Sequence, residues 1–323
     1  MASSLGESHL LREGDCFRES RIKTVLVLPV TFKVSFMKNI YESITSQILE
    51  QLEKGVVPWQ RPWKTRFAMP KNYLSQSHYH GVNVLLLWLQ GYSSPQWLTY
   101  CQAKALGGNV KQGEKGTKIL YYSLIVKETE RKNEKGEDVF DKVPLIKLHT
   151  VFNLSQIEGL EIAEVPSQEV DSDLLCENML ENFTNKPKIT FGFNSANYQH
   201  CDDVVQMPNR NQFNSAGNYY ATLFHELGHS TGHKTRLHRD SLYNVKEWGD
   251  HEYSKEELVA EMTSSFLCAH MGIEKETLQN SVSYIQSWIE VLRADGEMLI
   301  KAASQAQKAC DYILNAHAQS IAA

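Results

Sequence analysis

The sequence predicts an α+β fold of two domains, and three observations support that prediction. The chain has 323 residues, 42% of them hydrophobic and 22% charged, which is typical of globular proteins and excludes fibres, wholesale disorder and membrane bundles. Segments with helical spacing of apolar residues alternate with segments typical of paired strands. Charge is divided unevenly, because residues 37–127 hold 11 Lys/Arg against 4 Asp/Glu, whereas residues 128–323 hold 17 against 30. We therefore expect the first half to meet a polyanion and the second half a different partner.

The first domain is predicted to start with a helix. Residues 1–36 are interpreted as a disordered extension, and the helix is predicted over residues 39–55. Apolar residues recur there at helical spacing and a glycine closes the segment: Ile40, Ile44, Ile48, Leu52 and Gly55.

Short helices and a hairpin are predicted to complete the first domain. The helices are expected over residues 82–90 and 98–106, and each is followed by glycine. A strand over residues 119–126, a solvated charged tip at 127–138 and a returning strand over 143–152 form the expected hairpin.

The boundary between the domains is predicted at about residue 165. Residues 158–173 become acidic and lose any periodic pattern, which favours a linker. The two domains are therefore expected to cover residues 37–165 and 166–323.

The second domain is predicted to be mostly helical. Helices are expected over residues 174–183, 219–233, 256–271 and 282–315, and strands over 189–193 and 204–207. The strand at Val204–Met207 is expected at the edge of its sheet, because Pro208 follows it.

The most specific signal is the sequence His225-Glu226-Leu227-Gly228-His229, an HExxH motif. Spacing of i, i+4 places both imidazoles on one face of a helix, aimed at a common point. Two neutral imidazole nitrogens suit Zn²⁺, although Mn²⁺ or Fe²⁺ also accepts such ligands. Glu226 is the candidate general base, placed to take a proton from water activated by the metal.

A catalytic zinc usually needs a third protein ligand. Glu257 and Glu261 share one face of the predicted helix over 256–271, so one of them can complete the set while the other orients a ligand imidazole. His233 is an alternative third ligand one helical turn beyond His229, although Gly232 indicates that the helix ends before it.

The basic half contains the ingredients of a surface for single-stranded DNA. Exposed aromatic rings stack on unpaired bases without demanding a sequence, and Lys or Arg neutralises phosphates. The candidate DNA-binding residues are Trp59, Arg61, Trp63, Lys64, Lys111, Lys115, Lys118 and Tyr121. Trp88 and Trp97 lie in apolar surroundings and are expected in the core.

The chain resembles two groups of known proteins. The HExxH helix followed by Glu257-Leu258-Val259-Ala260-Glu261 is similar to gluzincin-like metallopeptidases. That resemblance implies that His225, His229 and Glu257 bind the metal, that Glu226 is the general base and that Glu261 supports a ligand histidine.

From Met37 to about Asn315 the chain also resembles ArdC-type antirestriction proteins of mobile elements. Several stretches together carry this resemblance: 39–55, 58–63, 79–83, 111–117, 151–153, 219–229, 231–233, 236–237 and 256–261. It implies an N-terminal domain that binds single-stranded DNA, a C-terminal zincin-like domain, and protection of incoming plasmid DNA from restriction, as in conjugation.

Two functions follow from these patterns. In the first, the protein binds single-stranded DNA and its metal domain hydrolyses a protein or peptide substrate. In the second, the protein only coats DNA and its metal site is structural. A cytoplasmic location is expected, because the six cysteines form no CxxC or disulfide framework and the apolar run at residues 24–30 is too short to span a membrane.

Overall fold

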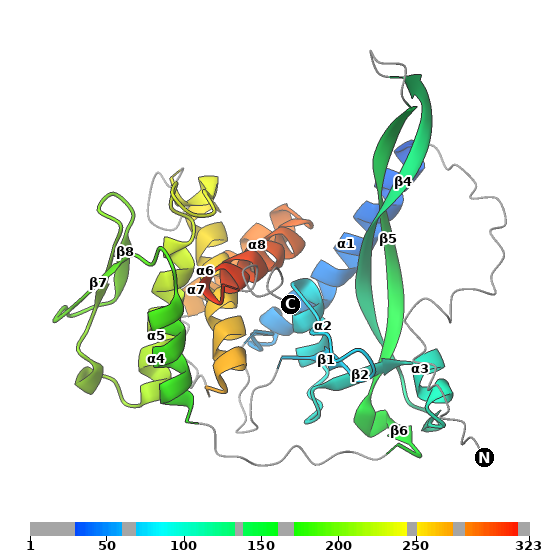
Figure 1. Cartoon of the computed structure of the whole chain (residues 1–323), viewed down its shortest axis with the longest axis horizontal. Helices are drawn as coiled ribbons and strands as arrows, with labels where there is room; N and C mark the ends of the chain where they lie inside the picture. The colour runs from blue at the N-terminus through cyan, green and yellow to red at the C-terminus, as the bar shows by residue number, and fades with distance from the viewer. Residues whose placement is uncertain are drawn as a thin grey trace, which may run out of the picture.

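The computed structural model describes residues 30–59, 69–132, 138–160, 171–243, 251–273 and 282–315. The first half contains α1 (Val30–Glu53), β1 (Lys71–Asn72), α2 (Val82–Trp88), β2 (Gln96–Thr99), α3 (Tyr100–Ala105), β3 (Asn109–Val110), β4 (Thr117–Lys132), β5 (Asp138–Asn153) and β6 (Ile157–Glu158). The second half contains α4 (Ser172–Asn182), β7 (Lys188–Phe191), β8 (Asn197–Gln199), β9 (Val204–Met207), α5 (Ala216–Ser230), α6 (His251–Met271), α7 (Val282–Ala294) and α8 (Met298–Ile313). The mixture of helices and sheets confirms the predicted α+β class (Figure 1).

The first sheet is built around the hairpin of β4 and β5. Its strand order is β1-β2-β5-β4, and β4 pairs antiparallel with β5 from Thr117 opposite Val151 to Lys132 opposite Asp138. The hairpin projects away from the helices α4–α8 (Figure 1). It is longer than predicted, because both strands continue into the segment expected to form the charged tip.

A side chain of α2 completes the outer edge of β4. The Asn83 amide donates to the carbonyl of Leu120 at 2.8 Å, and its oxygen accepts from the Leu120 amide at 2.7 Å. Asn83 therefore makes the two bonds that a neighbouring strand would make, which anchors the hairpin on α2.

Two boundaries in the first half differ from the prediction. The segment 30–36, expected to be disordered, forms the first turns of α1, and only residues 1–29 of that extension lie outside the described residues. Residues 98–99 belong to β2, and the helix α3 begins at Tyr100. The reason is a capping box, in which the Thr99 hydroxyl accepts from the Gln102 amide at 3.2 Å and the Gln102 side chain accepts from the Thr99 amide at 2.9 Å.

The second sheet corrects the prediction of an edge strand at Val204–Met207. Its order is β7-β9-β8, so β9 lies in the middle, parallel to β7 and antiparallel to β8. Pro208 gave the wrong indication because it follows the last paired residue, Met207, and removes no ladder hydrogen bond. The edges of this sheet are β7 and β8.

The two halves share one hydrophobic core. Residues of α1 and α2 belong to the same buried cluster as residues of α5, α6, α7 and α8. Trp88 of α2 contacts Phe266 of α6 with ring centroids 5.8 Å apart, and the amide of Gly81 donates to Gln307 of α8 at 3.1 Å. Two smaller buried clusters lie within the first half alone, one around Trp97 and the other around Leu98.

Within the described residues, no helix combines the length and the apolar character that crossing a bilayer requires.

Candidate metal centre

The metal centre depends on the close approach of α5 and α6. Ser215 caps α5 by accepting from the Asn218 amide at 3.1 Å. A Cβ atom at Gly228 would lie 3.2 Å from Cα of Ala260, so glycine in the HExxH motif leaves room for α6. Ser264 fixes the pairing by donating to the carbonyl of Ala221 at 2.7 Å.

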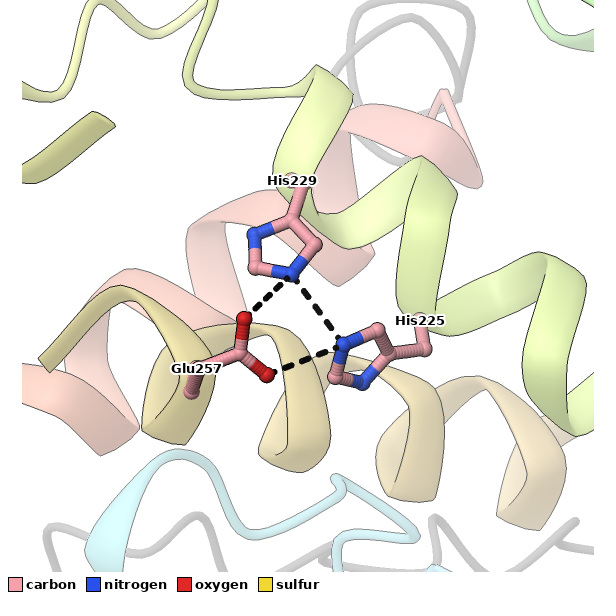
Figure 2. Close-up of side chains that lie close together, drawn as sticks. All are labelled: His225, His229 and Glu257. Atoms are coloured by element: carbon pink, nitrogen blue, oxygen red, sulfur yellow. Dashed lines mark hydrogen bonds and ion pairs between the residues drawn. The ribbon is translucent and has the colours of Figure 1, made fainter. Parts of the chain in front are cut away.

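Three side chains from these helices converge on one point (Figure 2). Nε2 of His225 lies 3.1 Å from Nε2 of His229, and the Glu257 carboxylate lies 3.4 Å from the first nitrogen and 3.3 Å from the second. Among the described residues, these three offer ligand atoms that all lie within 4.8 Å of one another. These three residues are the ones that the resemblance to gluzincin-like metallopeptidases implies as ligands.

Each histidine has a second carboxylate on its other nitrogen. Nδ1 of His225 lies 3.5 Å from Glu261, and Nδ1 of His229 lies 3.4 Å from Glu256. Carboxylates accept hydrogen bonds, so they favour the tautomers that carry the proton on Nδ1. Both Nε2 lone pairs then face each other and the Glu257 oxygens, and these nitrogen and oxygen atoms would be the ligands of a divalent cation.

The electrostatics of the centre favours positive charge on the two imidazoles. Burial opposes protonation of His229, but the Glu257 carboxylate overrides this and raises the pKa of that imidazole to about 9. Burial likewise opposes ionisation of Glu257, and the charge of His229 lowers the pKa of that carboxyl well below its ordinary value. The carboxylates around the two imidazoles therefore favour positive charge at this place.

Glu226 lies beside the ligands without joining them. The side chain is buried, and burial raises the pKa of its carboxyl above the ordinary value, although both ligand histidines oppose the shift. The backbone amide of Tyr198, on β8, donates to this carboxylate. A carboxylate with a raised pKa at this place has the proton affinity that a general base requires.

His233 does not join the group of three. The helix α5 ends at Ser230, so His233 lies in the following turn, where its Nδ1 is 2.8 Å from the Thr235 hydroxyl. The prediction that the helix ends before His233, based on Gly232, is therefore confirmed.

Sequence reasoning missed Glu256, Arg239 and Ser241, which surround the second ligand histidine. Glu256 immediately precedes Glu257, and the helix turns it toward His229 and away from the point of convergence. The Arg239 guanidinium, despite burial, lowers the pKa of Glu256 to about 2. The pair of adjacent glutamates was the available signal, but only the packing of α5 on α6 gives each its role.

The predicted DNA-binding residues divide into three groups. The prediction that Trp59 is exposed for stacking is wrong. Its ring is fully buried and packs edge-on against Trp288 of α7, with ring centroids 5.2 Å apart. Arg61, Trp63 and Lys64 lie outside the described residues. Four others are exposed as predicted: Lys111, Lys115, Lys118 and Tyr121. Trp88 and Trp97 lie in the core, as expected.

Tyr121 has two neighbours that the sequence did not indicate. The ring of Tyr121, 47% exposed, lies 5.0 Å from the ring of His149 on β5, and Lys147 stands directly opposite Tyr121 in the register. Burial and the charge of Lys147 lower the pKa of His149, which favours the neutral imidazole. These three residues form an aromatic and basic surface on one face of the hairpin, which we call the hairpin face.

Two family models match successive parts of the chain. Residues 38–152 match the N-terminal domain of the anti-restriction factor ArdC, and residues 177–305 match a zincin-like metallopeptidase. The predicted boundary at about residue 165 lies between the matches and within the undescribed residues 161–170, so it stays a prediction.

The chain is also similar to solved structures and to curated proteins. The metal-free crystal structure of antirestriction protein ArdC from plasmid R388 is 35% identical, with a TM-score of 0.69 over 86% of this chain and 98% of that one. The Mn(II)-bound structure of the same protein gives a TM-score of 0.67 over 85% and 97%.

Among curated proteins, an uncharacterised protein y4eC of Sinorhizobium fredii is 32% identical over 87% of this chain and 92% of its own length. A DNA primase TraC of Escherichia coli is 36% identical over 86% of this chain. The match spans only 27% of that primase and 20% of a second TraC protein.

Proposed function

The chain belongs to the ArdC-type antirestriction family, and from this premise we propose that it binds single-stranded DNA and protects incoming mobile-element DNA with the help of a metal-dependent peptidase centre. The observation that carries the proposal is the convergence of His225, His229 and Glu257, with Glu226 buried beside them. The similar ArdC protein of plasmid R388 was solved with Mn(II). We therefore assign a divalent cation to this centre, with Zn²⁺ or Mn²⁺ as the candidates.

The residues of the chain support peptide hydrolysis in the following way. A divalent cation held by the three ligands would supply Lewis acidity and lower the pKa of water, to about 7 in the case of zinc. Glu226 takes the proton from the attacking water and passes it to the leaving amine. Three protein ligands leave a coordination position open, which favours a catalytic over a structural site.

The edge strand β8 is suited to hold an extended peptide along this centre. The amide of Tyr198, on β8, reaches Glu226, so the strand lies beside the proposed base. Among the described strands, β8 pairs with β9 alone and keeps its other edge for an added strand.

The hairpin face is the proposed site for single-stranded DNA. Tyr121 and His149 offer rings for stacking on unpaired bases, and Lys147, directly opposite Tyr121, offers charge for phosphates. Both strands of the hairpin contribute, so the bases are expected to lie across β4 and β5.

Glu226→Gln tests whether hydrolysis is needed for protection. The substitution removes the proton acceptor and keeps the shape of the side chain, so folding and metal content should match the wild type. Peptide hydrolysis should fall about 10²- to 10⁴-fold, the usual contribution of a general base. The measurements are cleavage of a quenched fluorescent peptide library and transformation of a restricting host with unmodified plasmid DNA.

The matched control is Glu181→Gln on α4, an exposed glutamate far from the ligands in sequence. It should behave as the wild type in every assay. If Glu226→Gln still protects unmodified DNA fully, protection comes from coating the DNA and the peptidase proposal is overturned.

A further inference from the structure

The segment that follows α5 carries a buried arginine, Arg239, which contacts the carboxylate beside His229. Arg239 and Glu256 are both buried. Nε of Arg239 donates to Oε2 of Glu256 at 3.1 Å, and its Nη2 atom contacts the other carboxylate oxygen. The Ser241 hydroxyl donates to the same Oε2 at 2.6 Å. Arg239 and Ser241 therefore both fix the Glu256 carboxylate, which lies 3.4 Å from Nδ1 of His229.

The same guanidinium also binds the helical turn that carries His229. Nη1 of Arg239 donates to the Thr231 hydroxyl at 2.6 Å, and Nη2 donates to the carbonyl of Gly228 at 2.8 Å. A Cβ atom at Gly232 would lie 3.0 Å from Nη2, so glycine at this position leaves the room that the guanidinium occupies. Thr231 therefore helps to bind the Arg239 guanidinium, and Gly232 leaves space for it, although neither residue is a metal ligand.

We infer that Glu256 is a positioning residue for the ligand His229, and that Arg239 and Ser241 hold it in place. The inference rests on the metal centre of the proposed function and goes beyond it. An imidazole bound only at Nε2 can rotate about its side-chain bonds, whereas a fixed acceptor at Nδ1 sets both the ring plane and the tautomer. Because Arg239 binds the backbone of the same turn, the carboxylate and the helix that carries the histidine cannot move independently.

Metal affinity of the full chain tests this inference without reference to peptidase activity. Metal is removed with a chelator, and Zn²⁺ and Mn²⁺ binding is measured by competition with a chromophoric chelator. Glu256→Gln and Arg239→Met should weaken the Kd about 10- to 100-fold, the usual loss when a partner of a ligand histidine is removed. The absorption spectrum of Co²⁺-loaded protein should shift as well, because the geometry around His229 changes.

A gentler variant covers the case in which these substitutions prevent folding. Ser241→Ala removes one hydrogen bond to Glu256 and leaves the arginine pair intact. It should weaken the Kd about two- to tenfold, which corresponds to one hydrogen bond.

The matched control breaks a different arginine–carboxylate pair of the same segment. Arg236 donates through Nη1 to Asp203 at 3.0 Å and touches none of the ligands. Asp203→Asn should lower the unfolding temperature of the chelated protein without changing the Kd or the Co²⁺ spectrum.

Three outcomes separate the inference from the proposed function. If Glu256→Gln or Ser241→Ala keeps the wild-type Kd while His225→Ala loses metal, the inference is overturned and the metal centre stands. If Asp203→Asn weakens the Kd as much as Glu256→Gln, the role of Glu256 is only structural and the inference is overturned. If the wild type itself binds neither metal, the proposed function fails first.

Discussion

At the scale of single residues, the centre consists of two imidazoles with three carboxylates around them. Glu257 faces both Nε2 atoms, and Glu256 and Glu261 face the two Nδ1 atoms. A carboxylate that accepts from Nδ1 makes the imidazole more basic, so its Nε2 lone pair binds a cation more strongly. The spacing of Glu257 and Glu261 predicts that they share one face of a helix, and both side chains of α6 do face the histidines. The sequence could not place Glu256, whose direction depends on the packing of α6 against α5.

Single alanine substitutions at the ligands test the assignment. His225→Ala and Glu257→Ala should each weaken metal binding more than about 100-fold, beyond the loss expected for residues that only support a ligand. Metal content after dialysis, measured by elemental analysis, checks this. His233→Ala should keep full occupancy, because its side chain lies outside the group of three. Full occupancy in Glu257→Ala, with loss in Glu261→Ala or His233→Ala, would show that the third ligand is wrong.

At the scale of elements, Tyr121 on the hairpin is exposed as the sequence predicted, whereas Trp59 after α1 is buried. Tyr121 stays exposed because side chains alternate along β4: Leu120 packs on the main buried cluster, and Tyr121 points to the opposite face of the hairpin. Trp59 is covered by Trp288, which lies near the other end of the chain. The periodicity of a strand shows which residues share a face, but it does not show whether another element covers that face.

Tyr121→Ala tests the hairpin face. Loss of one stacking ring should weaken binding to a single-stranded oligonucleotide by about 1–3 kcal/mol, without a change in unfolding temperature. Fluorescence anisotropy at two salt concentrations checks this, since contacts with phosphates weaken as salt rises. Phe191→Ala on β7 is the matched control, because that ring is 54% exposed on the other sheet. Equal losses in both variants would remove the hairpin face as the DNA site.

At the scale of the whole molecule, the two family regions are joined by a common core. The helices α1 and α2 belong to the first region, yet they pack on α6, α7 and α8 of the second. The helix α6 carries Glu257 near its start and contacts Trp88 through Phe266 further along. The metal centre and the hairpin are therefore held by one packed body.

Expression of residues 166–323 alone tests this union. The fragment exposes the surfaces that α1 and α2 cover, and each large apolar side chain left exposed costs about 1.5–3 kcal/mol. We expect the fragment to unfold at a lower temperature than the full chain or to aggregate, as followed by circular dichroism and size-exclusion chromatography. A fragment as stable as the full chain would show that the shared core contributes nothing.

The contact between the halves also predicts a dependence of stability on pH. His270 at the end of α6 contacts His78, with ring centroids 5.6 Å apart, and burial together with His78 and His80 lowers the pKa of His270 to about 4. The folded protein therefore favours neutral His270, a contribution fully present above pH 6.5 and lost as pH falls toward 4. It amounts to about 3 kcal/mol at most.

Urea denaturation between pH 4 and 7 measures this dependence. His270→Phe keeps an aromatic ring against His78 and cannot titrate, so its free energy of unfolding should fall less steeply with acid than that of the wild type. Equal slopes in the two proteins would contradict the assignment to His270.

The sequence by itself determined the local features: the helix that aligns His225 with His229, the helix that aligns Glu257 with Glu261, the hairpin and the α+β class. These features depend on the spacing of residues within one segment, which the chain carries wherever that segment lies. Tertiary structure alone decided that β9 lies inside its sheet, that Trp59 is buried, that Glu256 faces His229 and that the two halves share a core. Each depends on a partner distant in sequence, and the close packing that brings the partners together leaves no mark on either segment alone.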